Sequence, residues 1–229
     1  MPPTTGQRVP IAALERLATY HRHLLDLEQE RITTISSASL ETHTGIPAAQ
    51  FRKDLSYFGE FGKPGVGYEV SHLRESIARI LRMDREQRVL LVGAGNLGAA
   101  LVGYPGLKEQ RLRLVAVFDN NYAKIGRRLW DMQILDVATL TEVNREMRAG
   151  IGIIAVPRQA AQGAADALIA AGVRAILNFA PATLRVPPGV MVRNVSFVQE
   201  LAVLSYHLAS LDGEDVTTPD YSNVENYEV

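Results

Sequence analysis

A glycine turn between a strand-like run and a helix-like run is the feature that most constrains the fold of this chain. Residues 88–92 are largely apolar and lead into Gly-Ala-Gly-Asn-Leu-Gly at residues 93–98. The first glycine of such a turn permits a tight bend, the second lets the backbone approach a phosphate, and the third lets a helix pack closely on a strand. The helix start also favours an anion. The spacing therefore predicts a dinucleotide-binding turn formed by Gly93, Gly95, Asn96, Leu97 and Gly98.

The rest of the chain after residue 88 supports this interpretation. Apolar, β-branched runs at 88–93, 112–119, 150–157 and 173–181 alternate with helix-like segments, of which the alanine-rich stretch 158–172 is the clearest. Continuous apolar strands are typical of parallel sheets that are covered on both faces. The predicted fold class is α/β, with a Rossmann-type, doubly wound parallel sheet.

Strand ends predict the rest of the nucleotide site. The second strand ends at Asp119, 21 residues after Gly98, where a carboxylate would accept hydrogen bonds from ribose hydroxyls. Its charge favours NAD(H) over a 2′-phosphorylated nucleotide, a preference weakened slightly by the cations downstream, Lys124 among them. Ligands bind beyond the carboxyl ends of parallel strands. The further predicted cofactor residues at these ends are Asn120, Ala155, Val156, Pro157, Asn178, Phe179 and Ala180.

The chain offers little for catalysis. Tyr104 and Lys108 have the Tyr-x-x-x-Lys spacing of a dehydrogenase pair, but Pro105 and Gly106 would break the helix that such a pair needs. Tyr104 is still predicted to touch the cofactor. The chain has no cysteine, and no histidine-rich metal spacing stands out. We predict no catalytic residue and no metal site, and we expect sensing rather than turnover.

Composition sets outer bounds. The formal net charge is −1, so bulk charge gives no support to nucleic-acid binding. No apolar run approaches the roughly 18 to 20 residues that span a bilayer, and the N-terminus lacks the apolar core of a signal peptide. We expect a cytoplasmic protein with no membrane partner.

The first 87 residues contain a candidate DNA-reading helix after Pro47. Helical spacing puts Ala48, Phe51, Leu55 and Phe58 within an arc of about 80°. The opposite side carries groups that suit base edges and phosphates, namely Gln50, Arg52, Lys53, Ser56 and Tyr57. A short helix precedes it, and a glycine-rich hairpin or wing at 62–70, with Lys63 and Gly65, follows. The alternative from the residues alone is an amphipathic helix with a merely solvated face.

Further elements complete the predicted organisation. Helices are expected over 10–28, from a Ser71 cap, and over 197–211. Phe197 begins an apolar face of the last helix and is predicted, with Phe179, to form an apolar wall of the cofactor site. The predicted domains are a winged-helix domain at 1–84, a Rossmann domain at 85–196, a C-terminal dimerisation helix at 197–211 and a disordered acidic tail at 212–229.

Several segments together resemble the Rex family of redox-sensing transcriptional repressors. They include FRKDLSYFGEFGKPGVGYEV, VGAGNLGAAL, VPRQAAQ and ILNFAPATL, and the resemblance covers roughly residues 8–211. It implies a homodimer that exchanges its C-terminal helix, binds inverted-repeat operators and is released by NADH, with NAD+ competing for the same site. By matching position it implies that Lys53, Ser56, Tyr57 and Lys63 contact DNA. It also implies that Lys124 helps to hold the adenosine diphosphate half, and that Tyr104, Pro157, Phe179 and Ala180 surround the nicotinamide.

Two positions depart from the family pattern. Many relatives have arginine at the wing tip, where this chain has Pro64. Relatives also often have an aspartate where this chain has Ser196, and that acid is thought to pair with an arginine matching Arg22 in one state and a tyrosine matching Tyr104 in the other. Ser196 cannot form an ion pair, so we expect a redox switch that is altered, weaker or wired through other residues. Two alternatives stay open: an NAD-dependent oxidoreductase with an accessory helical domain, and a DNA-binding protein that uses NAD structurally.

Overall fold

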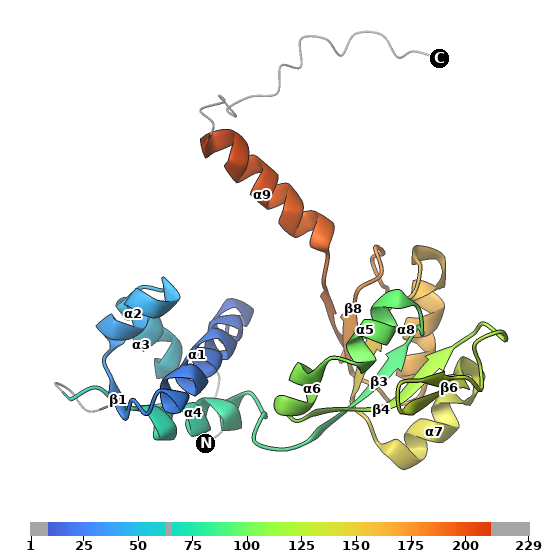
Figure 1. The fold of residues 1–229 in the computed structure, drawn as a ribbon, viewed down its shortest axis with the longest axis horizontal. Coiled ribbons are helices and arrows are strands. Elements are labelled where there is room, and N and C mark those ends of the chain that lie inside the picture. The colour runs from blue at the N-terminus through green and yellow to red at the C-terminus, as the bar shows by residue number, and fades with distance from the viewer. Residues whose placement is uncertain (1–8, 63–65, 212–229) are drawn as a thin grey trace, which may run out of the picture. The chain divides into compact units, whose positions relative to one another are not determined.

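The structure, a computed structural model, describes residues 9–62 and 66–211 (Figure 1). The predictions for Lys63, Pro64, Gly65 and the tail 212–229 therefore lie outside the described residues. The described part divides into two compact units. The first runs up to Gln87 and includes Gly106–Leu112, and the second comprises Arg88–Pro105 and the chain from Arg113 onward. The assignment of 1–84, 85–196 and 197–211 to separate domains stays a prediction.

The first unit is a helical cluster closed by a short antiparallel strand pair. Its elements are α1 (Ile11–Gln29), β1 (Thr34–Ile35), α2 (Ser37–Thr44), α3 (Ala48–Ser56), β2 (Tyr68–Glu69) and α4 (Val70–Ile80). Strand β2 pairs with β1. The largest side chains of its core that are shielded completely from solvent are Leu17, Tyr20, Leu24, Leu40, Phe51, Leu73 and Ile77.

The residues predicted to begin and end these helices are found at those positions, with one exception. Pro47 precedes the first turn of α3, where its missing N–H costs no hydrogen bond. Helix α2 ends at Gly45, which has a positive φ of 69°. The prediction that Ser71 caps α4 was wrong. Glu69 stands at the cap position, and the Ser71 hydroxyl, already inside the helix, donates to its carboxylate over 2.8 Å.

The second unit is a doubly wound sheet, as predicted. In the described chain seven strands follow the order β5-β6-β4-β3-β7-β8-β9. Their bounds are β3 (Gln87–Val92), β4 (Leu112–Asp119), β5 (Arg128–Leu129), β6 (Met132–Asp136), β7 (Ile151–Ile154), β8 (Ala175–Asn178) and β9 (Met191–Asn194). The β4–β6, β3–β7, β7–β8 and β8–β9 pairs are parallel, and the β5–β6 pair is antiparallel.

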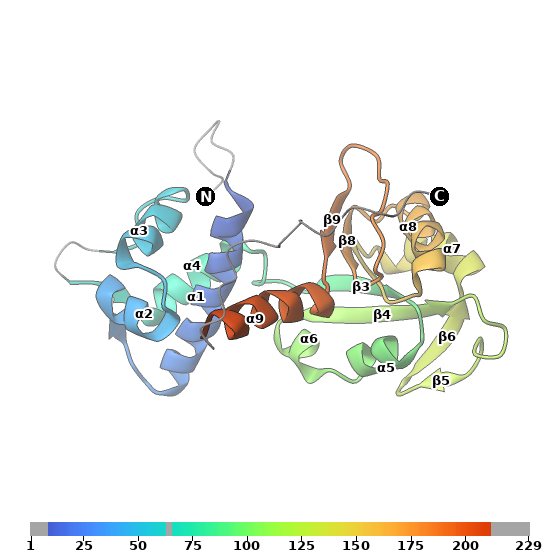
Figure 2. The same cartoon turned by 90° about the horizontal axis from the view of Figure 1, so that it is seen from above.

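Helices cover both faces of this sheet. Figure 2 shows α5 (Asn96–Val102) on one face and α7 (Leu140–Met147) and α8 (Ala161–Ala170) on the other. Short 3-10 turns, η1 (Val137–Thr139) and η2 (Arg158–Ala160), precede α7 and α8. The five-residue helix α6 (Pro105–Glu109) begins at the proline that ends any continuation of α5, so the predicted break after Tyr104 is confirmed.

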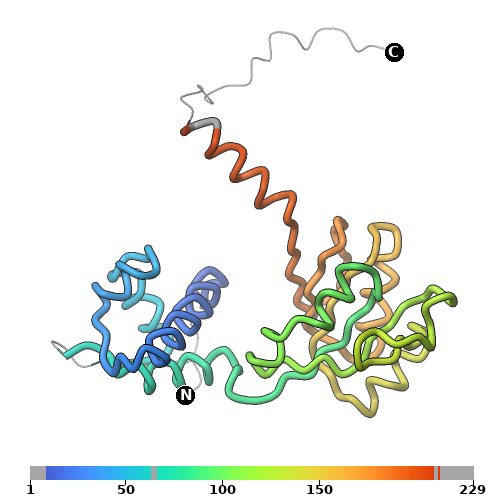
Figure 3. Tube along the Cα trace, viewed as in Figure 1, coloured from blue at the N-terminus to red at the C-terminus, as the bar shows by residue number. Residues whose placement is uncertain are grey.

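The last described helix, α9 (Phe197–Leu211), follows β9 almost directly (Figure 3). Its bounds are those predicted from the sequence. Every residue of α9 with a described side chain is exposed. The large apolar side chains that this leaves in solvent are Phe197, Val198, Leu201, Val203, Leu204, Tyr206, Leu208 and Leu211. A helix this apolar is normally covered.

Candidate functional site

The order of the sheet places a cavity at its switch point. The chain leaves β3 toward β4 on one side and returns later to β7 on the other, so the carboxyl ends of β3 and β7 open into a crevice. A cavity of about 700 Å³ lies there. Its walls come from the ends of β3, β4 and β7 and from η1, η2 and α8. The residues that line it are Val92, Gly93, Gly95, Asp119, Asn120, Asn121, Lys124, Val137, Ala138, Ala155, Val156, Pro157, Gln159, Ala160, Gly163, Ala164 and Ala167.

The three glycines of the turn differ in why each must be glycine. Gly93 has a φ of 110°, and a Cβ there would meet the Ala155 carbonyl oxygen at 2.3 Å. A Cβ on Gly98 would lie 1.9 Å from the Gly93 carbonyl oxygen, so this glycine lets α5 pack on the loop. At Gly95 no atom of the described residues, apart from Gly95 and its two chain neighbours, lies within 4 Å of the Cβ position. The protein leaves this space open beside the first turn of α5, as a bound phosphate requires.

Asp119 holds the glycine loop to the end of β4. Its carboxylate accepts hydrogen bonds from the backbone N–H of Ala94 at 2.9 Å and of Asn121 at 2.9 Å, and from Lys124 Nζ at 3.0 Å. Burial acts to raise the pKa of Asp119. The hydrogen bonds from Asn121, Lys124 and Ala94, together with the charge of Lys124, outweigh it and lower the pKa. Asp119 is therefore an ionised, partly satisfied acceptor at the cavity wall.

Many of the predicted nucleotide residues come together here, and others do not. Asn120, Lys124, Ala155, Val156 and Pro157 line the cavity with Gly93, Gly95 and Asp119. Asn96, Leu97 and Gly98 follow in the first turn of α5 but are not among the lining residues. The wall formed by Ala160, Gly163, Ala164 and Ala167 was not predicted from the sequence. Its signal was the run of small residues in RQAAQGAADA, which leaves room beside the strands.

Asn178 has a structural place rather than a position facing the cavity. It is fully buried, its Nδ2 lies within hydrogen-bonding distance of the carbonyls of Ala180 and Ala182 and of Asn194 Oδ1, and its Oδ1 accepts from the Ala180 N–H. The side chain thus holds the turn that presents Phe179. The Phe179 and Phe197 rings stack with centroids 6.4 Å apart. Tyr104 is exposed, and none of these residues is among those lining the cavity.

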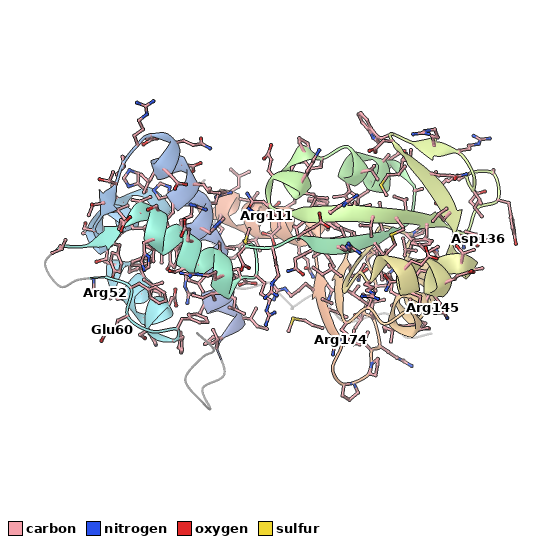
Figure 4. All side chains as sticks on the ribbon, turned by 90° about the horizontal axis from the view of Figure 1, so that it is seen from below. Arg52, Glu60, Arg111, Asp136, Arg145 and Arg174 are labelled. Carbon is pink, nitrogen blue, oxygen red and sulfur yellow. The ribbon has the colours of Figure 1, made fainter. Side chains whose placement is uncertain are left out.

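The candidate DNA-reading face lies on α3. Phe51 and Leu55 are buried, whereas Arg52, Lys53 and Ser56 are exposed, as the helical spacing predicts. Arg52, labelled in Figure 4, reaches back to α2 and donates from Nη1 to the Ser37 hydroxyl over 2.8 Å. The exposed face of α3 therefore carries two cations and a hydroxyl on a helix that is fixed by its other side.

Two other predicted DNA residues have different surroundings. Tyr57 is half-buried at the end of α3. The amide of Gln50 donates over 2.8 Å to Asp54, a buried acid that also binds Arg16 and Tyr20. The role of this acid was not predicted from the sequence, because Asp54 lies 38 residues from Arg16. Its only local signal is a charge beside the apolar arc of α3.

The three predicted switch residues occupy separate elements. Arg22 is exposed on α1, and Tyr104 is exposed in the turn after α5. Ser196 precedes α9, and its hydroxyl accepts from the backbone N–H of Gln199 over 3.3 Å. Ser196 therefore has the hydrogen bond of an N-cap residue.

Comparison with known proteins identifies the family. Residues 8–56 match a family described as a putative DNA-binding protein N-terminus, and residues 84–182 match one described as a CoA binding domain. The redox-sensing transcriptional repressor Rex of Carboxydothermus hydrogenoformans is 45% identical over 203 residues, which cover 89% of this chain and 98% of that protein. The Rex of Desulforamulus reducens is 46% identical, covering 88% and 96%. The chain belongs to the Rex family of redox-sensing transcriptional repressors.

Solved Rex structures agree with this membership. The crystal structure of RSP, a Rex-family repressor, superposes with a TM-score of 0.82 at 34% identity, covering 90% of this chain and 97% of RSP. RSP in complex with β-NAD+ and operator DNA gives a TM-score of 0.84 at 35% identity, covering 92% and 100%. RSP with β-NADH gives 0.81 at 34%, covering 90% and 97%. The Rex fold predicted from the residues is thus confirmed, and the Rex relatives are named as repressors rather than as enzymes.

Proposed function

We propose that this chain represses transcription by binding operator DNA through its first unit and is released when NADH occupies the cavity of its second unit. The observation that carries the proposal is the cavity at the β3–β7 switch point, because it combines an open glycine turn with an ionised ribose acceptor in a Rex-family chain. NAD+ competes for the same cavity. The chain acts where the chromosome lies, so we place it in the cytoplasm.

The residues fit an adenosine diphosphate group. The open space at Gly95 accommodates a phosphate, and the remaining acceptor capacity of Asp119 suits a ribose hydroxyl. Coenzyme A and NAD(H) share an adenosine diphosphate half, so the match to a CoA binding domain is compatible with this assignment. We assign the binding of this half to Gly93, Gly95, Asn96, Leu97, Gly98, Asp119, Asn120 and Lys124.

The nicotinamide ring supplies the signal, because it is cationic when oxidised and neutral when reduced. An apolar wall favours the neutral ring, since removing a cation from water is costly. The stacked pair Phe179 and Phe197 provides such a wall at the end of β8 and the start of α9. Moving a repressor from nearly all bound to nearly all released needs about 5.5 kcal/mol of differential affinity. We assign Tyr104, Ala155, Val156, Pro157, Phe179, Ala180 and Phe197 to this half of the site.

DNA binding rests on α3 and on pairing of two copies. Arg52, Lys53 and Ser56 lie exposed on the face of α3 opposite its core, and Lys and Arg side chains bind phosphates and guanine edges. Two such helices would read the two halves of an inverted repeat. The exposed apolar face of α9 is the surface that we assign to the dimer, with exchange of the helix between the two copies.

We also propose that the chain does not turn over its nucleotide. Among the residues that line the cavity, the titratable side chains are Asp119 and Lys124, and these form an ion pair at 3.0 Å. A general acid or base must be able to exchange a proton with a substrate at the working pH. An ionised aspartate with a lowered pKa, held by a lysine and two backbone N–H groups, is unsuited to that task. In the described chain, no group of three or more histidine, aspartate or glutamate side chains could hold a metal ion.

A mobility-shift experiment tests the proposal. The protein is incubated with an inverted-repeat operator, selected from a random duplex pool by the protein itself, and NADH and NAD+ are titrated separately. Release by NADH at concentrations where NAD+ leaves the complex intact supports the sensor. Binding that ignores both nucleotides supports a repressor that uses NAD structurally. Turnover of a hydroxy or oxo substrate without DNA binding supports the oxidoreductase.

Within the described ranges no helix is long and apolar enough to span a membrane.

A further inference from the structure

A buried carboxylate ties the inner face of α3 to α1. Asp54 is 0% exposed, and described side chains donate four hydrogen bonds to it. Arg16 binds it through two nitrogens of its guanidinium, which donate from Nε to Oδ2 at 2.6 Å and from Nη2 to Oδ1 at 2.7 Å. The Tyr20 hydroxyl donates to Oδ2 at 3.0 Å, and Gln50 Nε2 donates to Oδ1 at 2.8 Å. Each oxygen thus accepts two bonds, which fills the capacity of a carboxylate.

Beside this carboxylate, aromatic contacts join α1, α3 and β2. The Tyr20 and Phe51 rings form a T-shaped pair with centroids 4.8 Å apart, and Phe51 forms another with Tyr68 of β2 at 5.2 Å. Tyr20 therefore contacts α3 twice, through its hydroxyl at Asp54 and through its ring at Phe51. The apolar part of this contact can hold α3 in place, but apolar packing is non-directional. The four hydrogen bonds are directional, and they fix the rotation of the helix about its own axis.

We propose that Asp54, held by Arg16, Tyr20 and Gln50, is a positioning residue for operator recognition. The proposal rests on the proposed function. Arg52 and Ser56 are exposed on the side of α3 opposite Asp54, and Lys53 is exposed about 100° from it, so the rotation set by the carboxylate sets where all three point. A rotation of roughly 20° moves a side-chain tip about 6 Å from the helix axis by about 2 Å. That displacement breaks a hydrogen bond to a base edge, whereas a flexible cation still finds a phosphate.

The network also gives Gln50 a role inside the protein. One N–H of its amide is bound to Asp54, while the second N–H and the carbonyl oxygen take no part in this network. The network joins α3 to α1, the helix that also carries Arg22.

The experiment separates sequence recognition from general DNA affinity. The affinities of the full-length protein for its selected operator and for a scrambled duplex of the same length are measured by fluorescence anisotropy for wild type, Asp54→Asn and Tyr20→Phe. Tyr20→Phe keeps the ring contact with Phe51 and removes one hydrogen bond without changing any charge. Glu28→Gln is the matched control, because Glu28 forms an ion pair of 2.8 Å with Arg74 between α1 and α4, on no part of α3. Thermal unfolding and NADH affinity are recorded for each protein.

We expect the ratio of operator to scrambled affinity to fall about tenfold or more in Asp54→Asn. In Tyr20→Phe it falls less, in the same direction. Scrambled-duplex affinity, which follows phosphate neutralisation, stays near wild type, and so does NADH affinity. Glu28→Gln leaves the ratio unchanged.

An unchanged ratio in Tyr20→Phe and Asp54→Asn overturns the inference, as does an equal loss on both duplexes that follows the loss of thermal stability. If Asp54→Asn does not fold, Tyr20→Phe decides alone. A wild-type protein that selects no operator at all would instead overturn the proposed function, and this inference with it.

Discussion

The backbone N–H of Ala94 donates to the Asp119 carboxylate over 2.9 Å, joining the glycine loop after β3 to the last residue of β4. The same carboxylate binds the Asn121 N–H and Lys124 Nζ. Asp119 thus shapes the glycine loop as well as lining the cavity. An acid expected from the sequence only to bind a ligand is also a structural part of the site that receives the ligand.

We expect Asp119→Asn to weaken NADH binding and to destabilise the second unit. One amide oxygen replaces two charged acceptors, and loss of partners for buried donors costs about 1–3 kcal/mol. Isothermal titration with NADH and thermal unfolding measure the two effects. Asp131→Asn, at an exposed position before β6, is the control and should match wild type. Equal NADH affinity in the two variants would contradict the assigned role of Asp119.

Gly95→Ala and Gly98→Ala should separate ligand binding from folding. The Cβ at Gly95 points into open space and its φ of −85° suits alanine, so we expect normal thermal stability and much weaker NADH binding. The Cβ at Gly98 meets a backbone oxygen at 1.9 Å, so overpacking should cost about 1–3 kcal/mol of stability or more. Unfolding curves and NADH titrations check both variants. Tight NADH binding by Gly95→Ala would contradict the proposal that a phosphate of the nucleotide occupies this space.

The contrast between local and distant contacts explains what the sequence could predict. The glycine turn, the strand ending at Asp119 and the helix over 197–211 were predictable because each depends on neighbouring residues. Strand β9 was not predicted, because Met191–Asn194 is short and mixed in polarity. It pairs with β8 after a loop, and Asn178 Nδ2 bonds to Asn194 Oδ1 across that pair. The Asp54 network was missed because no helical period reveals which distant helix supplies an arginine.

Lowering the pH below about 6.5 should destabilise the first unit. Burial, and then the charge of Arg74, lowers the pKa of His21, while Glu28 acts in the opposite direction. The folded pKa therefore lies below the unfolded one, and the unfolded chain binds the proton first. The contribution of neutral His21 to the free energy of unfolding is complete above the unfolded pKa, and it is lost as the pH falls toward the folded pKa.

Urea unfolding between pH 7.5 and 5 measures this loss. His21→Phe removes the proton site and should flatten the dependence, while the lowered pKa of His23 leaves a smaller residual slope. His72→Phe, at an exposed position on α4, is the control for the substitution itself. The explanation fails if His21→Phe keeps the wild-type slope.

Leu204→Lys on α9 should dissociate the proposed dimer. Phe197, Leu201, Leu204 and Leu208 recur at helical spacing on one exposed face, and a lysine there would bury an unpaired charge between the copies. Ala202→Lys, about 130° around the same helix from the centre of that face, adds the same charge away from it. Light scattering after size exclusion should give half the mass for Leu204→Lys and the wild-type mass for Ala202→Lys. Unchanged mass in both would place the dimer contact elsewhere.

Ser196→Asp and Ser196→Ala should distinguish the capping role of this position from its role in the switch. Serine and aspartate both cap a helix start, whereas alanine loses about 1 kcal/mol of helix stability. The Ser196 hydroxyl already accepts the Gln199 N–H, so Ser196→Asp should preserve α9. It adds a charge able to pair with Arg22 in one state and to accept from Tyr104 in the other, as the family pattern implies.

We therefore expect Ser196→Asp to widen the gap between operator affinity without nucleotide and with NADH by about tenfold, equivalent to about 1.4 kcal/mol. Ser196→Ala should leave that gap near the wild-type value while it weakens α9. Mobility shifts across an NADH titration measure the gap, and circular dichroism reports the helix. If Ser196→Asp responds to NADH as wild type does, the switch of this chain runs through residues other than position 196. The new charge would then have left the ratio of the operator affinities with and without NADH unchanged.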